Sequence, residues 1–370
     1  MERNYAIDYV KFWAILFIVC IHTKPFKGAM VLGVEGDDIH LLINTFARFG
    51  VPFFFVGSGF LYGQKLLTSG NQKEYFNRYF LKLVKLFIYW YLFYILYGLV
   101  IRIVNAFGEG SSIGAAILEY VDSFIGVEEF VLFLVYGDAG GPASYHLWYL
   151  PALIWSILTV FVFIKRNRLN VLLGISLCLN LFGLLGQTYA GIVDWEFFNS
   201  NVTSRDAVFF GLFYTTLGCS IAYHYKWIRQ KIAQVHSSVF VLLVVVFSIT
   251  QIGERVVATM LWSEEIKGVD FYLSTIFLTL SLFLFVIKNG HIGKGSILAK
   301  VGKNAVGIYV AHTLFVDLTF MILDSYEVGL RQTVVFHLLF TPIVVVLAYL
   351  FYSLVQFIKL EIKKRFEENW

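Results

Sequence analysis

Asp8-Tyr-Val-Lys-Phe-Trp-Ala-Ile-Leu-Phe-Ile-Val-Cys-Ile-His22 lies near the start of the chain and is apolar except at Asp8, Lys11 and His22. In an α-helix, the eleven steps from Lys11 to His22 give a net rotation of about 20°, and the fourteen steps from Asp8 give about −40°. The three side chains therefore share one stripe of one helix. Ionisable groups in hydrocarbon cost roughly 3 kcal/mol each, so they face protein or water and usually mark function.

The composition of the whole chain is that of a membrane protein. Of the 370 residues, 58% are hydrophobic and 15% are charged, whereas soluble domains contain about 25% charged residues. The three cysteines lie in apolar stretches, which indicates small buried residues rather than a disulfide framework or a metal cluster. The net charge of +4 does not indicate nucleic acid, because the basic residues are distributed by membrane side.

Ten apolar runs are long enough to cross a bilayer, which takes roughly 17–25 residues. They are residues 5–22, 41–62, 83–104, 145–164, 169–187, 206–225, 236–253, 269–288, 302–323 and 333–358. The sequence therefore predicts an all-α polytopic membrane protein, a bundle of about ten transmembrane helices. We expect a single transmembrane domain over residues 1–370, with no separate soluble domain.

The segments between these runs alternate in charge. The loop from Asn105 to Tyr145 contains six acidic residues and neither lysine nor arginine, whereas the Lys165–Arg168 turn and four other segments are basic. Because lysine and arginine are retained in cytoplasmic loops, both termini are predicted to be cytoplasmic, in a multi-pass protein of the cell membrane. The loop around Glu128 is then extracytoplasmic, and a short helix lying on the membrane is expected near Ile113–Phe124.

His22 falls near the outer end of the first span under this topology. A neutral imidazole there could take a proton from a hydroxyl group. The alternative is a buried histidine whose hydrogen bonds are satisfied by a neighbouring helix. Asp8 and Lys11 are three residues apart, so these two charges could instead neutralise each other.

Further candidates lie in three other spans. His146 is again at an outer end, while Tyr309 and His312 share a face of the ninth span, where an interhelical hydrogen bond is the alternative to chemistry. Arg48 lies inside the second span and needs a partner or a water-filled cavity. The histidines are not spaced as metal ligands, and no carboxylate cluster accompanies them, so no metal site is predicted.

A basic segment precedes the third span. Arg78, Lys82 and Lys85 lie on one helical face at the predicted cytoplasmic side. These side chains could bind the phosphates of a cytosolic cofactor. Contact with lipid headgroups is the alternative.

Over nearly its whole length the chain resembles the acyltransferase family 3 membrane proteins. The matching stretches are Asp8–His22, Val51–Leu61, Arg78–Lys85, His146–Leu150 and Gly302–His312. The resemblance implies transfer of an acyl group, usually acetyl from cytosolic acetyl-CoA, to a sugar hydroxyl of an envelope glycan or glycolipid. It also implies that His22 is the essential histidine. Lys11 stands where the family commonly has arginine, a change that keeps the charge but loses the bidentate fork.

The resemblance implies a distribution of roles. Acyl-CoA would be a substrate rather than a permanently bound cofactor, held near Arg78 and Lys82, and Arg48 or Tyr309 would stabilise the oxyanion. The alternative is a transporter, in which the same polar cavity would pass a small solute such as an amino acid without a covalent step. The chain also resembles the membrane half of serine racemases. The expected partners are the lipid bilayer and the glycan acceptor, and no nucleic acid is expected. The sequence leaves undecided whether the protein forms a homo-oligomer.

Overall fold

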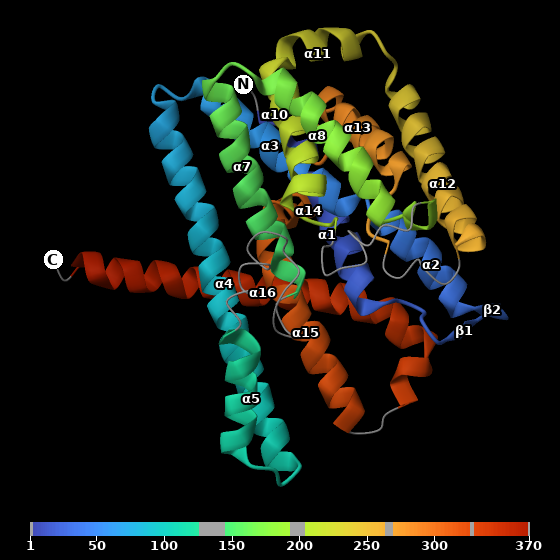
Figure 1. Ribbon diagram of the computed structural model, residues 1–370, viewed down its shortest axis with the longest axis vertical. Helices are drawn as coiled ribbons and strands as arrows, with labels where there is room; N and C mark the ends of the chain where they lie inside the picture. The colour runs from blue at the N-terminus through green and yellow to red at the C-terminus, as the bar shows by residue number, and fades with distance from the viewer. Residues whose placement is uncertain (1–2, 126–144, 193–203, 263–268, 326–328, 369–370) are drawn as a thin grey trace.

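The chain forms a bundle of α-helices in the computed structural model, which describes residues 3–125, 145–192, 204–262, 269–325 and 329–368 (Figure 1). The α-helices are α1 (Tyr5–Thr23), α2 (Gly36–Ala47), α3 (Gly50–Thr68), α4 (Gln72–Gly108), α5 (Ile113–Ile125), α7 (Tyr149–Lys165), α8 (Leu169–Gly183), α10 (Leu212–Tyr223), α11 (Tyr225–Ala233), α12 (Ser237–Leu261), α13 (Leu273–Lys288), α14 (Ile297–Gly302), α15 (Ala305–Ser325) and α16 (Val334–Glu368). Shorter helical turns are η1 (Tyr145–Trp148), η2 (Leu184–Gly186), η3 (Ala190–Ile192), η4 (Ala207–Gly211) and η5 (Gly329–Gln332), and strands β1 (Met30–Val31) and β2 (Val34–Glu35) pair antiparallel.

Each of the ten predicted spans contains a helix in the part of the chain that the structure describes. Eight helical segments there are long and apolar enough to cross a membrane. A ninth, from η4 through α10 into α11, bends by 81° before α11, and α13 is a shorter apolar helix of 16 residues. The prediction of an all-α polytopic membrane protein is confirmed.

Helix α1 lies inside the bundle and packs against α2, α3, α14, α15 and α16. It begins where the Asn4 side chain accepts a hydrogen bond from the Ile7 amide, and ends where Lys24 adopts a left-handed conformation. Ala14, Ile15 and Val19 are fully buried. The apolar residues of α1 therefore hold its polar stripe in a fixed orientation toward the neighbouring helices.

Helices α3 and α10 pack backbone against backbone. A Cβ atom added to Gly59 would lie 2.0 Å from the Thr215 carbonyl oxygen, and one added to Gly218 would lie 2.0 Å from the Val56 carbonyl oxygen. Only glycine fits at both positions, because real side chains never approach so closely. This contact fixes α3, which lies beside the stripe of α1.

The helix expected near Ile113–Phe124 is present as α5, but it packs along α4 instead of standing apart on the membrane surface (Figure 1). The Tyr120 hydroxyl donates a hydrogen bond to the Ile95 carbonyl oxygen over 2.8 Å. Helix α4 has 37 residues and is roughly 55 Å long, whereas the hydrocarbon core is about 30 Å thick. Its excess length provides the surface that α5 covers. Glu128 lies outside the described residues.

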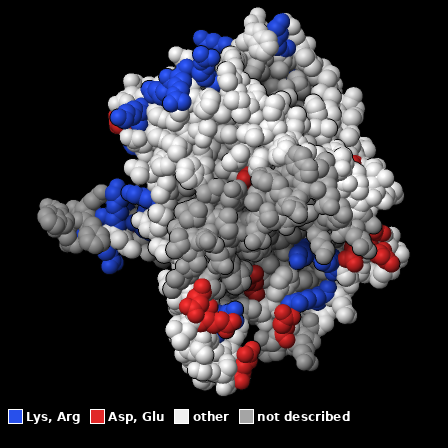
Figure 2. Space-filling view, in the orientation of Figure 1, with Lys and Arg blue, Asp and Glu red and all other residues white. Residues whose placement is uncertain are grey.

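Charged side chains are unevenly distributed over the face in Figure 2. Lysine and arginine gather along its upper left margin, near the chain start, and most acidic side chains lie on its lower part. Ten crossings would bring both termini to the same side. The orientation with cytoplasmic termini remains a prediction from the positive-inside rule.

Cysteine labelling tests this orientation. The two substitutions are made in a variant that lacks the three native cysteines. Leu32→Cys lies in the β1–β2 hairpin, just beyond the His22 end of α1, and Thr68→Cys is at the last residue of α3, on the predicted cytoplasmic side. Both positions are exposed. We expect an impermeant maleimide to label Leu32→Cys in intact cells, and Thr68→Cys only after permeabilisation. The reverse pattern would invert the orientation and place His22 on the cytoplasmic side.

Candidate active site

Three histidines from distant parts of the chain meet inside the bundle. His22 lies in the last turn of α1, His146 in the η1 turn that leads into α7, and His312 in the middle of α15. The ring centroids of His22 and His312 are 4.9 Å apart, and those of His146 and His312 are 5.4 Å apart. The structure thus brings together the three histidines that the sequence places in separate spans. Among the described residues, no group of three or more His, Cys, Asp or Glu is arranged to hold a metal ion.

The hydrogen bonds of His312 fix the position of its proton. Its Nδ1 lies 2.6 Å from the Tyr309 carbonyl oxygen. Because a carbonyl only accepts, Nδ1 carries the hydrogen, and Nε2 of the neutral ring keeps its lone pair. Nε2 is buried and has no hydrogen-bond partner among the described residues. His312 therefore presents a bare proton acceptor within the histidine cluster.

His146 is held more closely than the other two histidines. It is buried, its Nδ1 and its Nε2 each lie 3.2 Å from the Thr313 hydroxyl, and its ring packs on Tyr94. The Tyr309 hydroxyl donates to its backbone carbonyl oxygen. These contacts favour a positioning role for His146. They also show that the hydroxyl of Tyr309 is already engaged.

His22 differs because it remains partly exposed. Its Nδ1 lies 3.0 Å from the Tyr145 hydroxyl. Sequence reasoning missed Tyr145 as a neighbour, since a tyrosine at the start of an apolar run is typical of the interfacial aromatic belt. Of the three rings, His22 is the one with access to a molecule entering from outside the bundle.

Arg48 has the partner that its place in a span required. It lies at the break between α2 and α3, donates to Asn44 over 2.9 Å, and forms an ion pair with Asp270. Arg205 pairs with the other oxygen of the same carboxylate over 3.2 Å. Both arginines are close enough to His22 to interact with it electrostatically. Two cations sharing one carboxylate leave a net positive charge beside the histidines.

Asp270 and Arg205 were not predicted from the sequence as members of the site. Asp270 was the stronger signal, because it is a carboxylate at the edge of the predicted span 269–288. Arg205 immediately precedes the span 206–225 and resembles an ordinary flanking charge. Its guanidinium stacks over the Trp148 ring at 5.2 Å.

The two other charged groups of the α1 stripe form no ion pair with each other. Asp8 pairs with Arg3 over 2.8 Å, so the expected neutralisation of Asp8 by Lys11 is replaced by a different ion pair. Among the described residues, the side chain of Lys11 forms no ion pair or hydrogen bond. It reaches toward Gly57 of α3. An unpaired ammonium group thus remains within the bundle.

A small apolar cavity lies between the levels of Lys11 and His22. Ile18, which is on the same stripe of α1, lines it together with Phe54, Tyr149 and Tyr309. The cavity measures about 10 Å³, close to the minimum that holds one water molecule. Any group accommodated there without rearrangement has to be very small.

Arg78, Lys82 and Lys85 are not part of the histidine cluster. They lie on α4, and Arg78 is exposed and 3.7 Å from Glu74 of the preceding turn. Lys82 and Lys85 are also exposed. The three side chains therefore lie on the exposed surface of α4, and their contact with phosphates stays a prediction.

Comparison with known proteins gives two results. A family model described as an acyltransferase domain matches residues 4–355. Two curated proteins of Enterococcus faecalis, both named amino-acid racemase, are similar. The first is 27% identical over 195 residues, covering 52% of this chain and 24% of the relative. The second is 25% identical over 246 residues, covering 62% and 30%. The chain thus spans less than a third of the length of either relative. No solved structure matches it.

Proposed function

The chain belongs to the acyltransferase family whose model covers residues 4–355, and from this premise we propose that it transfers an acetyl group from cytosolic acetyl-CoA to a hydroxyl of a cell-envelope glycan. The observation that carries the proposal is the cluster of His22, His146 and His312, in which one ring presents a bare Nε2. Acyl transfer to a hydroxyl needs such a proton acceptor.

In the proposed reaction His22 acts as the general base. It accepts the proton of the acceptor hydroxyl while the hydroxyl oxygen attacks the thioester carbonyl carbon. The resulting tetrahedral oxyanion collapses, the carbon–sulfur bond breaks, and the proton passes from the imidazole to the departing thiolate. His312 lies next to His22 and offers a second nitrogen lone pair for the same proton.

Of the two residues predicted to stabilise the oxyanion, Arg48 is the better candidate. Tyr309 already donates its hydroxyl hydrogen to the His146 carbonyl oxygen. Arg48 and Arg205 share a single carboxylate, so their excess positive charge is available to a developing anion. Their role is electrostatic, since both guanidinium groups are held by Asp270.

The small apolar cavity supports a short acyl group. Ile18 and Phe54 bring its walls close together, and at about 10 Å³ it holds little more than one water molecule without rearrangement. It lies on the stripe that joins Lys11 to His22. An acetyl group is thus the donor that requires the least rearrangement of the helices.

Transfer of label tests the proposed function directly. Membrane vesicles containing the protein are given acetyl-CoA labelled in the acetyl group, together with envelope glycans from a deletion strain. We expect label on the glycan, and none with vesicles containing His22→Ala. Uptake of an amino acid without any transfer of label would contradict the proposal and favour the transporter alternative.

Lys11 offers a second, independent test. Its ammonium group is unpaired among the described residues and lies roughly 16 Å from His22 along α1, so we expect it to attract an anionic part of the donor rather than the oxyanion. Lys11→Met should abolish acetyl transfer without unfolding the protein, because it removes the charge and keeps the chain length. Lys11→Arg is the matched control and should retain activity.

Acetyl transfer and thermal unfolding in detergent are measured for both variants. Full activity of Lys11→Met would show that the charge serves no step of the reaction.

A further inference from the structure

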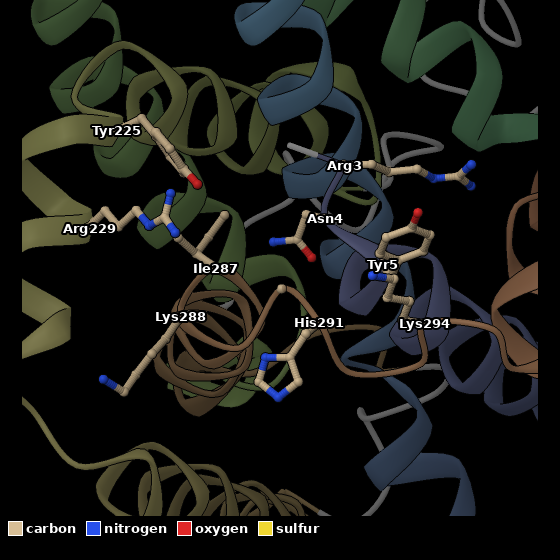
Figure 3. Close-up of a pocket in the computed structure, with 10 residues that line it drawn as sticks. Arg3, Asn4, Tyr5, Tyr225, Arg229, Ile287, Lys288, His291 and Lys294 are labelled. Atoms are coloured by element: carbon tan, nitrogen blue, oxygen red, sulfur yellow. The ribbon is translucent and has the colours of Figure 1, made fainter. Parts of the chain in front are cut away.

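A second, strongly basic cavity lies at the end of the bundle where the chain begins (Figure 3). Its volume is about 450 Å³, which is within the usual range for small-molecule sites. It is built from four separate segments: the residues before α1, the first turns of α11, the end of α13, and the loop between α13 and α14. We call it the inner basic cavity; its polar lining includes Arg3, Tyr225, Arg229, Lys288, His291 and Lys294.

The lining of this cavity carries positive charge without matching negative charge. Four lining residues are lysine or arginine and none is acidic. Arg3 is paired with Asp8, and Lys288 donates to two carbonyl oxygens at the end of α11, over 3.0 and 3.2 Å. The side chains of Arg229 and Lys294 form no ion pair or hydrogen bond among the described residues. These two cations thus border a concave space in which an anion would be stabilised.

The orientation of the side chains agrees with this distribution. In Figure 3 the guanidinium of Arg229 extends from α11 toward Asn4, into the space between the segments, whereas Arg3 points away from it. On the other side, Gly293 has a φ of +79°, and a Cβ atom there would lie 2.6 Å from Cβ of Tyr9. The loop can therefore pass close to α1 only with glycine at this position, and this places Lys294 at the cavity.

We propose that the inner basic cavity binds the phosphate groups of a phosphorylated ligand. Guanidinium and ammonium groups that converge on one concavity match the charge and geometry of phosphate. The identity of the ligand as acyl-CoA rests on the proposed function, because acetyl-CoA carries its phosphates at the end opposite to the thioester. An anionic lipid headgroup has the same chemistry and is the other source.

The cavity is better suited to phosphate than the Arg78–Lys85 face. That face belongs to a single helix, and Arg78 is already near Glu74. The cavity, in contrast, encloses its ligand from four segments. It also adjoins the start of α1, the helix that carries Lys11 and then His22 roughly 26 Å from Tyr5. The long arm of acyl-CoA could follow this helix from the cavity toward the histidines.

Binding of unacylated coenzyme A tests the proposal without any acyl transfer. Isothermal titration is done on the full chain in phosphatidylcholine nanodiscs. For the double variant Arg229→Gln with Lys294→Gln we expect the dissociation constant to rise about 100-fold, since each lost charge-assisted contact accounts for roughly tenfold. The matched control is Arg166→Gln with Arg168→Gln, which removes two exposed cations of the Lys165–Arg168 turn on the same predicted side of the membrane and should change binding less than about twofold.

A second arm identifies the source of the phosphate. Thermal unfolding of the wild type and of both double variants is compared in nanodiscs with and without phosphatidylglycerol. Stabilisation by this lipid that is lost only in the Arg229 and Lys294 double variant would support the cavity with a headgroup as ligand. If that variant keeps both wild-type coenzyme A binding and wild-type lipid stabilisation, the proposal is overturned.

The results distinguish a failure of the phosphate-binding proposal from a failure of the proposed reaction. If the Arg229 and Lys294 double variant transfers acetyl and binds coenzyme A like the wild type, the proposed acyltransferase reaction is supported. Phosphate binding in the inner basic cavity is then contradicted. Alternatively, the wild type could bind coenzyme A and transfer no label, while the double variant no longer binds coenzyme A. This result would support phosphate binding in the cavity and contradict the acyltransferase reaction.

Discussion

His22→Ala is expected to lower acetyl transfer by about 10²–10⁴-fold, the usual contribution of a positioned general base. The ring is partly exposed, lies 4.9 Å from the ring of His312, and shares one stripe of α1 with Lys11. Because His22 is less buried than His146 and His312, we expect thermal unfolding and coenzyme A binding to stay close to those of the wild type. Labelled acetyl on the glycan, measured per folded protein, gives the result.

Two further variants separate chemistry from packing. His22→Gln keeps a donor and an acceptor but cannot take up the proton, so it should be nearly as inactive as alanine. His146→Gln is the matched control: its ring is held by Thr313 and Tyr94, and we expect a lower melting temperature with a smaller loss of activity. Near wild-type acetylation by His22→Gln would remove the catalytic role of His22.

Asp270→Ala is expected to destabilise the protein more than most surface substitutions. The Asp270 carboxylate is the shared partner of Arg48 and Arg205, and the side chains of Asp270, Arg48 and Arg205 are only 14%, 14% and 25% exposed. Removing one member of a buried ion pair typically costs about 3–5 kcal/mol, because the remaining charge loses its compensation. Here two arginines would be left to repel each other. Thermal unfolding in detergent measures the loss.

The pair of Arg331 with Asp324 provides the comparison, because its side chains are 40% and 67% exposed. Exposed ion pairs contribute about 0–1 kcal/mol, so Asp324→Ala should change the melting temperature little. An Asp270→Ala variant as stable as Asp324→Ala would show that the arginines find other partners or water. Reduced activity in a stable Asp270→Ala variant would instead show that the carboxylate is needed to hold Arg48 in position.

The order and approximate positions of the apolar helices could be predicted from the sequence because a membrane span leaves a long apolar run. The break inside residues 41–62 could not. Here α2 ends at Ala47 and α3 begins at Gly50, with Arg48 turned toward Asp270, a partner 222 residues away. Likewise, α5 is a helix as expected, but its position against α4 depends on the Tyr120 contact with Ile95.

The candidate site was predictable in part for the same reason. Histidines in apolar runs are conspicuous, and the topology places His22 and His146 at a similar depth. His312 falls in the middle of its span, so its place beside the other two could not be predicted. The bare Nε2 of His312 depends on the local backbone contact with Tyr309, which no pattern of residue types indicates. The inner basic cavity was missed because each of its four segments contributes only one lysine or arginine, which alone resembles an ordinary topology signal.

Helix α1 is one uninterrupted rod from the inner basic cavity to the histidines, with no glycine or proline among its 19 residues. Its register therefore couples the two ends. Inserting a single residue after Lys11 would turn His22 by about 100° away from its stripe and shift it by about 1.5 Å. Both the length and the helical register of α1 are therefore constrained by the groups at its two ends.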